Sequence, residues 1–529
     1  MIRLIAFGVS LCLASCSLGD VARGVVYEDT SRDGVRQTGE PGIEGVRISN
    51  GRDVVLTDEA GRYEIEAIEG EAIFVIKPSG HALPLDELNK PQFYYVYSPK
   101  GSPRGLRYAG VAPTGALPDS IDFALHASNE PDRFSVILLG DPQPRNITEL
   151  EYFAQDVIAD VRATELADDA AFVFSLGDIM FDTLSLFGPY DEYMSLLDKP
   201  VHNVHGNHDM NFDVPDDTHA DATWNRLYGP ATYAFDYGEA HFIVLDNVVY
   251  EGDKDYHADL NDAQLAFIRN SLEHVSTDRL VVLAMHIPLP SVRRKAELFE
   301  ILAPYEHTFS MGAHWHRQIH FFMDSEDGWT GVAPHHHLVH ATGCGSWWAG
   351  ALDERGIPHA TMSDGQPNGW SLLTIDGNEY TIRFKAAGEP ANQQMAVHLP
   401  SVLQAADVQG TNLVVNAWAS NPRSTVEFRV DDGEWTPMTH TPQRDPGYLS
   451  LKLLEEQFPG QPGRDLPEAR ESQSTWQAPL PRGLQAGPHM VEVRHTDMFG
   501  QVWTGRRPLR VRGAPMPSVE AWMLAFERH

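Results

Sequence analysis

The sequence predicts a multidomain α/β plus β protein, in which a central layered α/β domain lies between two β-sandwiches. Its 529 residues, at roughly 150 residues per domain, suggest three or four folded parts. Apolar strands alternate with helical patterns between residues 133 and 385, which is typical of a layered α/β fold. Short alternating strands between Gly- and Asp-containing turns occupy residues 20–128 and 386–529, which favours sandwiches there.

The composition is that of a folded and strongly acidic protein. Hydrophobic residues make up 42% of the chain, and the formal net charge is −34. Proteins that bind a nucleic-acid backbone need a basic face, so we expect no binding of this kind. A small phosphate-binding site stays compatible with this charge, because a bound metal ion reverses the local sign.

Residues 1–16 have the layout of a secretory signal. Arg3 precedes an apolar run, Leu4–Ala14, which is too short to cross a bilayer as a mature helix. The run ends Leu-Ala-Ser-Cys at Cys16 and resembles the bacterial lipobox, which implies cleavage before Cys16 and lipidation of that residue. The alternative is an ordinary signal peptide with a chance cysteine.

The lipobox resemblance implies an exported lipoprotein of the bacterial cell envelope, held at the membrane through its lipid anchor only. Ser17 follows the cysteine, which by analogy with enterobacterial sorting favours the outer membrane or a periplasm-facing location. After processing, Cys16 and Cys344 would remain. We therefore expect no intramolecular disulfide, and packed cores must stabilise the protein.

The N-terminal part, residues 20–128, resembles the immunoglobulin-like or transthyretin-like modules of exported bacterial proteins. Strands are expected at 24–27, 46–48 and 62–65, with a turn-rich stretch before the second. That stretch contains Asp29, Asp33 and Glu40, whose hard oxygens could hold Ca²⁺. The alternative is that these are solvated turn carboxylates.

The central part, residues 133–385, is expected to alternate strands and helices. The strands are expected at 134–139, 171–176, 201–204, 241–245 and 280–285. A first helix is expected to start with a capping box at Thr148 and Glu151, and a second at Asn261 and Gln264, because such pairs satisfy the free N–H groups of a first turn. The C-terminal part, residues 386–529, is predicted to be a second sandwich without a cluster of reactive side chains.

Potential metal ligands follow the ends of the central strands, where α/β folds place their sites. The motifs are Asp141-Pro142-Gln143, Gly177-Asp178, Gly206-Asn207-His208-Asp209, His286 and His314-Trp315-His316. Any one of them is a weak signal, but five in this order after predicted strands indicate one shared site. Oxygen and imidazole donors together suit Mn, Fe or Zn.

These motifs resemble those of the calcineurin-like metallophosphoesterase family. The resemblance covers about 250 residues and implies a four-layer αββα domain with two metal ions at the strand ends. It implies that the first ion binds Asp141, Gln143, Asp178 and His316, and that the second binds Asp178, Asn207, His286 and His314. Gln143 stands where the family usually has His, so we expect the first ion to be held less tightly by this neutral ligand.

The resemblance also implies the catalytic roles of two residues. His208 would contact the scissile phosphate or protonate the leaving oxygen, and Asp209 would orient His208 through a hydrogen bond. Residues 335–370 resemble a subgroup of exported bacterial phosphoesterases with a β-sandwich at each end. Within that stretch Trp347, Trp348, His336 and Asp364 are candidate substrate contacts, with core packing as the alternative.

The function expected from the sequence is hydrolysis of a phosphomonoester or phosphodiester outside the cytoplasm, by a metal-bound hydroxide at a di-metal centre. The substrate would be small or linked to a lipid or sugar. The alternative is a surface lipoprotein that binds envelope glycan or polymer and carries an inactive phosphoesterase domain. The identity of the substrate, the native metals and the oligomeric state stay open.

Overall fold

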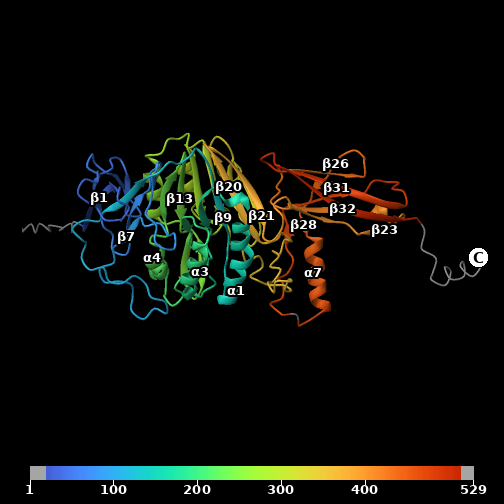
Figure 1. Ribbon diagram of the computed structural model, residues 1–529, viewed down its shortest axis with the longest axis horizontal. Coiled ribbons are helices and arrows are strands. Elements are labelled where there is room, and N and C mark those ends of the chain that lie inside the picture. Colours follow the sequence, from blue (N-terminus) through green and yellow to red (C-terminus); the bar gives the residue numbers. More distant parts are fainter. Residues whose placement is uncertain (1–18, 461, 514–529) are drawn as a thin grey trace, which may run out of the picture.

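The computed structural model describes residues 19–460 and 462–513 (Figure 1). The predicted signal segment with Cys16 lies outside the described residues, as do residues 514–529 of the predicted C-terminal part. Within the part of the chain that the structure describes, no helix is both long and apolar enough to cross a membrane.

The central part contains two mixed sheets. The first has the strand order β11-β10-β9-β20-β21. Its strands are β9 (Arg133–Leu139), β10 (Ala170–Ser175), β11 (Val201–Asn203), β20 (Gly369–Asp376) and β21 (Glu379–Ala386). Strands β9, β10 and β11 are parallel, and β20 pairs with β9 in the antiparallel sense.

The second central sheet has the strand order β12-β13-β16-β17-β19-β18. Its strands are β12 (Tyr233–Tyr237), β13 (Ala240–Leu245), β16 (Leu280–Met285), β17 (His307–Gly312), β18 (Ile319–Met323) and β19 (His335–Val339). Strands β13, β16, β17 and β19 are parallel, and β12 and β18 form antiparallel edges. A small hairpin, β14 (Val248–Gly252) and β15 (Asp255–Ala258), follows β13.

The first sheet packs against the second sheet on one face and against helices on the other. Phe172 on β10 contacts Phe242 of the second sheet, with ring centroids 5.4 Å apart. Ile137 and Leu139 on β9 instead share a core with Leu150 and Phe153 from the helical segment that follows. Because strand side chains alternate between faces, one face of this sheet meets the second sheet and the other is covered by helices.

The helices of the described residues are short. They are α1 (Ile147–Phe153), α2 (Ala159–Ala163), α3 (Phe187–Ser195), α4 (Ala222–Tyr228), α5 (Asp262–Leu272), α6 (Lys295–Leu302) and α7 (Pro446–Gln457), with a π-helical turn at Ala154–Ile158 joining α1 to α2. Short 3₁₀ turns occur at Glu165–Ala167, Leu184–Leu186, Asp217–His219, Leu289–Ser291 and Val408–Gly410.

One of the two predicted helix starts is confirmed and the other is wrong. Asn261 and Gln264 form the expected capping box of α5. The cap of α1 is Asn146, whose side chain accepts a hydrogen bond from the Glu149 N–H at 3.1 Å. Asparagine caps helices at least as well as threonine, so the helix begins one residue before Thr148.

The N-terminal part contains two four-stranded sheets, β4-β1-β8-β6 and β3-β2-β5-β7. Their strands are β1 (Val21–Glu28), β2 (Arg47–Ser49), β3 (Val54–Leu56), β4 (Arg62–Glu66), β5 (Ala72–Ile76), β6 (His81–Ala82), β7 (Tyr94–Val96) and β8 (Phe123–Ala127). Strands were therefore predicted at the right places, whereas the sandwich architecture stays a prediction.

The turn carboxylates of this part bind backbone and side-chain donors of the protein. Asp29 accepts hydrogen bonds from the N–H groups of Arg32 and Gly34 at 2.6 and 2.8 Å. Glu40 accepts from the N–H groups of Thr30 and Gln37 at 3.0 and 2.9 Å, and Asp33 from Gln37 Nε2 at 2.6 Å. These bonds use carboxylate oxygens that Ca²⁺ would need, and they account for the turn shape without an ion.

The C-terminal part also contains two main sheets, β22-β24-β30-β27 and β23-β32-β31-β25-β26, and a small pair β28-β29. Their strands are β22 (Met395–His398), β23 (Val402–Gln404), β24 (Asn412–Ala417), β25 (Thr425–Val430), β26 (Thr436–Pro437), β27 (Thr439–His440), β28 (Gln443–Arg444), β29 (Glu471–Ser472), β30 (Thr475–Pro479), β31 (Gly487–Thr496) and β32 (Val502–Arg512). Helix α7, which was not predicted, interrupts these strands and extends toward the side of the molecule that carries α1 (Figure 1).

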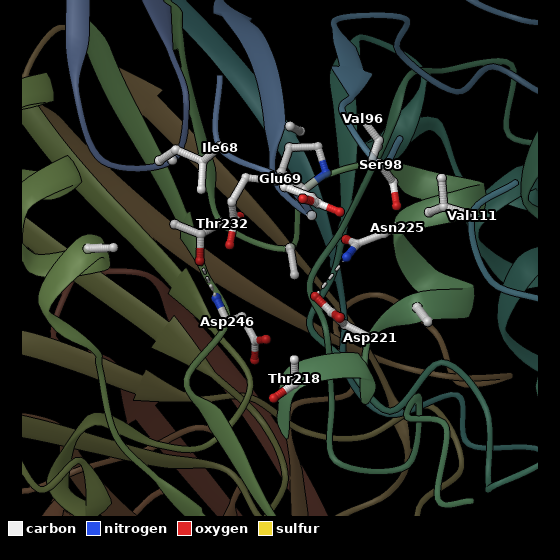
Figure 2. Close-up of a pocket in the computed structure, with 18 of the residues that line it drawn as sticks. Ile68, Glu69, Val96, Ser98, Val111, Thr218, Asp221, Asn225, Thr232 and Asp246 are labelled. Atoms are coloured by element: carbon white, nitrogen blue, oxygen red, sulfur yellow. Dashed lines mark hydrogen bonds between the residues drawn. The ribbon is translucent and has the colours of Figure 1, made fainter. Parts of the chain in front are cut away.

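A cavity of about 590 Å³ lies between the N-terminal sheets and the central domain (Figure 2). Its charged lining is mostly acidic and includes Glu69, Glu71, Asp217, Asp221 and Asp246. The predicted metal ligands are not among the described residues that line it. An anionic phosphoester would be repelled by these carboxylates, so this large cavity is a poor candidate for the reaction site.

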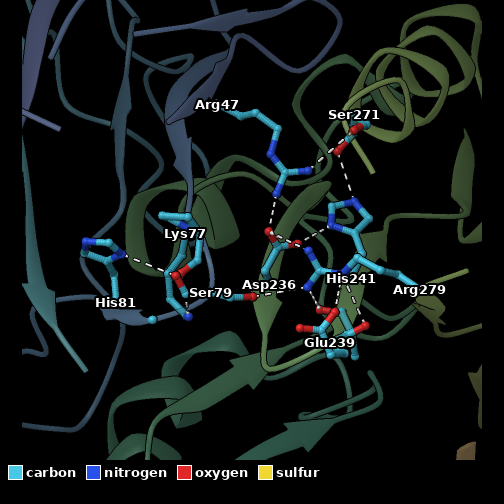
Figure 3. Close-up of polar contacts among 12 residues, drawn as sticks. Arg47, Lys77, Ser79, His81, Asp236, Glu239, His241, Ser271 and Arg279 are labelled. Atoms are coloured by element: carbon cyan, nitrogen blue, oxygen red, sulfur yellow. Dashed lines mark hydrogen bonds and ion pairs between the residues drawn. The ribbon is translucent and has the colours of Figure 1, made fainter. Parts of the chain in front are cut away.

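A buried polar network joins the N-terminal part to the central domain (Figure 3). Arg47 on β2 donates to Asp236 on β12, and both side chains are buried. His241 Nδ1 donates to the other oxygen of Asp236 at 2.6 Å, and the Asp236 N–H donates to the Lys77 carbonyl oxygen at 2.8 Å. Burial would raise the pKa of Asp236, but the hydrogen bond from His241 and the nearby cationic groups lower it to about 2.

We predict that Arg47→Met destabilises the protein by about 3 kcal/mol, because it removes the cation that donates directly to the buried Asp236 carboxylate and leaves only Arg279, at 3.9 Å, beside it. The comparison is Arg23→Met, which removes an exposed pair with Glu64 and should change stability by less than about 1 kcal/mol. Urea unfolding followed by tryptophan fluorescence measures both. Since the pKa of Asp236 is lowered, its contribution should be complete above about pH 4 and be lost as the pH falls toward 2. Equal effects of the two substitutions would contradict this role.

Candidate metal centre

The side chains predicted to bind metal all lie at the carboxyl ends of the central strands. They are Asp141 and Gln143 after β9, Asp178 after β10, Asn207 after β11, His286 after β16, and His314 and His316 after β17. All are buried except His314, which is half-buried. Residues that are up to 175 positions apart in the sequence therefore meet at one edge of the two sheets.

Three of these side chains form a tight cluster. Asp178, His286 and His314 each offer a ligand atom, and these atoms lie within 4.8 Å of one another. His286 Nε2 lies 3.2 Å from Asp178 Oδ2 and 3.1 Å from Asn207 Oδ1. This mixture of imidazole and oxygen donors suits a divalent transition-metal ion.

Two backbone carbonyls determine which nitrogen of His286 and His316 faces the cluster. His286 Nδ1 donates to the Leu176 carbonyl oxygen at 2.8 Å, and His316 Nδ1 donates to that of Gly345 at 2.6 Å. A neutral imidazole carries one proton, so Nε2 of each ring keeps a free lone pair. Proteins commonly orient metal-binding histidines by such bonds.

Asp141 brings a second buried carboxylate beside Asp178. Its Oδ2 accepts a hydrogen bond from the His314 N–H at 3.0 Å, whereas its Oδ1 is buried without a hydrogen-bond partner among the described residues. Burial and the charge of Asp178 raise the pKa of Asp141 to about 8. The two carboxylates therefore resist simultaneous ionisation unless a cation lies between them.

Gln143 lies in the cluster, but its amide oxygen points away from Asp178. The amide nitrogen donates to Asp178 Oδ2 at 3.0 Å, and the amide oxygen lies 3.8 Å from Cys344 Sγ. Gln143 could bind a metal ion through oxygen only after its amide group turns over. Burial raises the pKa of the Cys344 thiol well above its usual value, which argues against a thiolate nucleophile at this position.

Left-handed backbone conformations are concentrated at these positions. The φ angles are 34° at Asp141, 43° at Gln143, 48° at Asp178, 64° at His314 and 50° at His316. A left-handed conformation costs an L-residue about 1–2 kcal/mol, and such strain is retained where surrounding structure holds a side chain for function. The strand ends therefore bend sharply so that their side chains converge.

Gly206 allows the loop after β11 to pass directly over Asp178. A Cβ atom at position 206 would lie 2.1 Å from the Asp178 backbone nitrogen and 2.5 Å from Asp178 Oδ1. No side chain fits into that space, since backbone atoms cannot move aside cheaply. The Gly-Asn-His-Asp motif thus needs its glycine for close approach.

The carboxylate that contacts His208 is Asp182, which corrects the prediction that Asp209 orients this ring. His208 Nδ1 donates to Asp182 Oδ1 at 2.6 Å, and Lys254 Nζ donates to Asp182 Oδ2 at 2.6 Å. Phe181 stacks on the His208 ring, with centroids 4.2 Å apart. The side chain of His208 is 24% exposed, so it can reach a bound molecule.

Asp209 has a structural role in the same loop. Its carboxylate accepts hydrogen bonds from the N–H groups of Ile179, Met180 and Gly206 at 3.1, 3.0 and 3.0 Å. These bonds tie the loop after β10 to the loop after β11. Asp209 consequently holds the backbone that carries Asp178 and His208, whereas the Nδ1 of the His208 ring is bonded to Asp182.

Of the four predicted substrate contacts, Trp347 is next to the cluster. Its indole stacks on the His316 ring at 4.2 Å between centroids and is partly exposed. Trp348 is a core residue that is 2% exposed, and its Nε1 donates to the Pro142 carbonyl oxygen at 3.0 Å. Adjacent tryptophans therefore have different roles, because they point to different sides of the loop.

His336 and Asp364 are not substrate contacts in this structure. His336 belongs to β19 and is buried between His320 and Tyr380, with hydrogen-bond distances of 2.9 and 2.7 Å. Asp364 is buried where the central domain meets the C-terminal part, and it accepts a hydrogen bond from Gln366 Nε2 at 2.8 Å. Both positions are packing sites whose polar groups are already paired.

The sequence analysis missed several residues that surround the cluster. Asp182 follows Asp178 by four positions and could have been considered, since it lies in the same loop. Lys254 and Tyr256 come from the β14–β15 hairpin; the Tyr256 ring centroid lies 6.0 Å from that of His314. Arg145 and Arg464 reach the Trp347 carbonyl oxygen. Nothing in the sequence signals that Arg464, in the C-terminal part, lies here.

Two family models match the chain. The C terminal of Calcineurin-like phosphoesterase matches residues 337–503, and the N terminal of Calcineurin-like phosphoesterase matches residues 30–109. The structure of purple acid phosphatase PPD1 from yellow lupin (Lupinus luteus) seeds is similar with a TM-score of 0.36 and 13% identity. The likeness covers 64% of this chain and 66%, just under two thirds, of that one. Comparison with curated protein sequences gave no match.

The two matched segments support a calcineurin-like metallophosphoesterase. The matched segments lie on both sides of the region that supplies most of the strand-end motifs.

We predict that Asp182→Asn and Asp209→Asn affect different properties. Asp182→Asn should lower kcat about 10- to 100-fold at unchanged thermal stability, because it removes the carboxylate that orients His208. Asp209→Asn should lower the stability by roughly 2 kcal/mol or more, because it weakens charge-assisted bonds to three backbone N–H groups. Steady-state kinetics and thermal unfolding separate the two effects. If the Asp209 variant had normal stability and lost more kcat than the Asp182 variant, the prediction that Asp209 orients His208 would be correct after all.

Proposed function

We propose that the strand-end cluster holds two transition-metal ions, Mn, Fe or Zn, and that the enzyme hydrolyses a phosphomonoester or phosphodiester outside the cytoplasm. The observation that carries this proposal is the unpaired Oδ1 of Asp141. This buried oxygen lies 4.0 Å from His286 Nε2 and 3.9 Å from His316 Nε2, too far for hydrogen bonds. Metal–ligand bonds are about 2.1 Å long, so two ligand atoms on opposite sides of one ion lie about 4 Å apart.

The donor set fits two ions. The first would take Asp141, Asp178, His316 and, after its amide turns over, Gln143. The second would take Asp178, Asn207, His286 and His314. Asp178 would be the ligand shared by the two ions, because its Oδ2 lies 3.0 Å from Gln143 Nε2 and 3.2 Å from His286 Nε2. When bound, two such ions withdraw charge from a phosphoryl group and lower the pKa of an attacking water.

Residues of this chain would position the substrate and move a proton. His208 has its Nδ1 committed to Asp182, so its Nε2 is the nitrogen left for the substrate. From there it could donate a proton to the departing oxygen, as a general acid. Phe181 lies flat on one face of the ring and limits its rotation. The Asp182–His208 pair would thereby keep the donor aimed in one direction.

The location of the reaction rests on the sequence alone. The lipobox-like end of residues 1–16 supports export and attachment through Cys16, and these residues lie outside the part that the structure describes. A binding lipoprotein with an inactive centre is the competing function. The complete donor set argues against it, since a protein without catalysis gains nothing from two unneutralised carboxylates in its interior.

We predict that the purified protein contains close to two transition-metal ions per chain and that chelation abolishes hydrolysis of bis-p-nitrophenyl phosphate or p-nitrophenyl phosphate. Addition of Mn²⁺ or Zn²⁺ should restore it. Asp141→Asn should lower the metal content by about one ion per chain and reduce kcat/KM by at least about 100-fold. Asp255→Asn is the matched control, because Asp255 is exposed on β15 outside the cluster. Plasma mass spectrometry and initial rates measure both properties, and full activity of metal-free protein would disprove the proposal.

A further inference from the structure

Arg145 and Arg464 converge beside the cluster from distant parts of the chain. Arg145 lies in the loop after β9, and Arg464 lies after α7 in the C-terminal part. Arg145 Nη1 donates to the Trp347 carbonyl oxygen at 3.2 Å, and Arg464 Nη2 donates to the same oxygen. Two full positive charges therefore meet at a single carbonyl group.

One buried carboxylate balances this pair of charges. Arg464 Nη1 donates to Glu149 Oε1 at 2.6 Å, and Arg145 Nη1 lies 3.8 Å from Glu149 Oε2. Two cations thus share one anion, which leaves a local excess of one positive charge in a protein with a net charge of −34. Like charges held this close are unfavourable until a second anion joins them.

The pair also has hydrogen-bond donors to spare. Each guanidinium carries five N–H donors, and the Trp347 carbonyl and Glu149 are their acceptors among the described residues. The side chain of Arg145 is 29% exposed and that of Arg464 is 42% exposed. Their remaining N–H groups are consequently open to a molecule that enters from solvent.

Direct contacts connect the two arginines to both sides of the cluster. Arg145 Cζ lies 4.0 Å from the centroid of the Phe181 ring, which stacks on His208. The residue whose carbonyl both arginines bind, Trp347, stacks on His316. Trp347 has a left-handed backbone with φ of 57°, a strained conformation for a bulky residue. An anion held by the pair would lie next to a phosphoryl group at the cluster.

We propose that Arg145 and Arg464 form an anion subsite beside the metal cluster and that the preferred substrates carry a second phosphate group next to the scissile one, as diphosphates do. The planar guanidinium fork matches two phosphate oxygens at once, which a lysine cannot do. This inference rests on the proposed function, because it assigns the substrate class of the same site. The C-terminal part thereby contributes to specificity and not only to stability.

The test compares two non-hydrolysable probes by isothermal titration calorimetry. Methylenediphosphonate carries two anionic groups and methylphosphonate carries one, and both are titrated into full-length, metal-loaded protein from which free metal has been removed. We expect Arg464→Gln and Arg145→Gln each to raise the ratio of the diphosphonate Kd to the phosphonate Kd about 10-fold or more. A change of this size in the ratio of the two Kd values corresponds to the loss of roughly one charge-assisted hydrogen bond. Arg506→Gln, which alters an exposed pair with Glu492 far from the cluster, should leave both constants unchanged.

Arg464→Lys protects the test against misfolding, since it keeps the charge and loses the fork. It should raise the ratio by a smaller factor than Arg464→Gln, about 3-fold or more. The proposed subsite would be overturned if the variants changed the Kd of both probes by the same factor. It would also be overturned if none of the three variants at positions 145 and 464 changed either Kd. The same samples are assayed with bis-p-nitrophenyl phosphate. Absence of hydrolysis with a changed ratio would count against the proposed function and still support the subsite.

Discussion

Buried negative charge at one edge of the central sheets is the constraint on which the rest of the structure depends. Asp141 and Asp178 lie side by side with almost no exposure to solvent, and such carboxylates are unfavourable in a protein interior unless a cation compensates them. His286 and His316 have their Nδ1 atoms bonded to backbone carbonyls, so each ring can offer Nε2 to a cation. The left-handed loops, the close approach at Gly206 and the bonds of Asp209 all hold these carboxylates where a cation can bind. Stability and metal content should therefore be coupled.

The protein as a whole is strongly acidic, whereas several cationic groups lie close to the cluster. The acidic body would repel an anionic substrate, but screening at physiological salt limits this repulsion to about 8 Å. Near the cluster, Arg145, Arg464 and Lys254 introduce positive charge, and the large acidic cavity lies elsewhere. The local arrangement of a few cationic groups thus decides which anions bind, whereas the net charge mainly describes the solvated surface.

The sequence predicted several central strands and the side chains that gather at their carboxyl ends, because both depend on short-range patterns. Runs of apolar residues indicate buried strands. The carboxyl ends of parallel strands lie at the same edge of a sheet. The partner of His208 could not be predicted this way. Asp209 is next to His208 in the sequence, whereas Asp182 is 26 positions away and reaches the ring because of how the Phe181–Asp182 segment turns, with φ of 60° at Asp182. Arg464 and helix α7 were missed because their position depends on how the C-terminal part packs, which no local pattern encodes.

The pairing of β9 with β20 has a consequence for how the chain acquires its structure. The two strands face each other over their full length, with Arg133 opposite Asp376 and Leu139 opposite Trp370, although more than 230 residues separate them. Such long-range pairing closes late, because the entropy of a large loop must be overcome first. During synthesis the apolar strand β9 therefore has one edge without its partner until β20 emerges. An unpaired strand edge of this kind is a site where chains can pair with one another and aggregate.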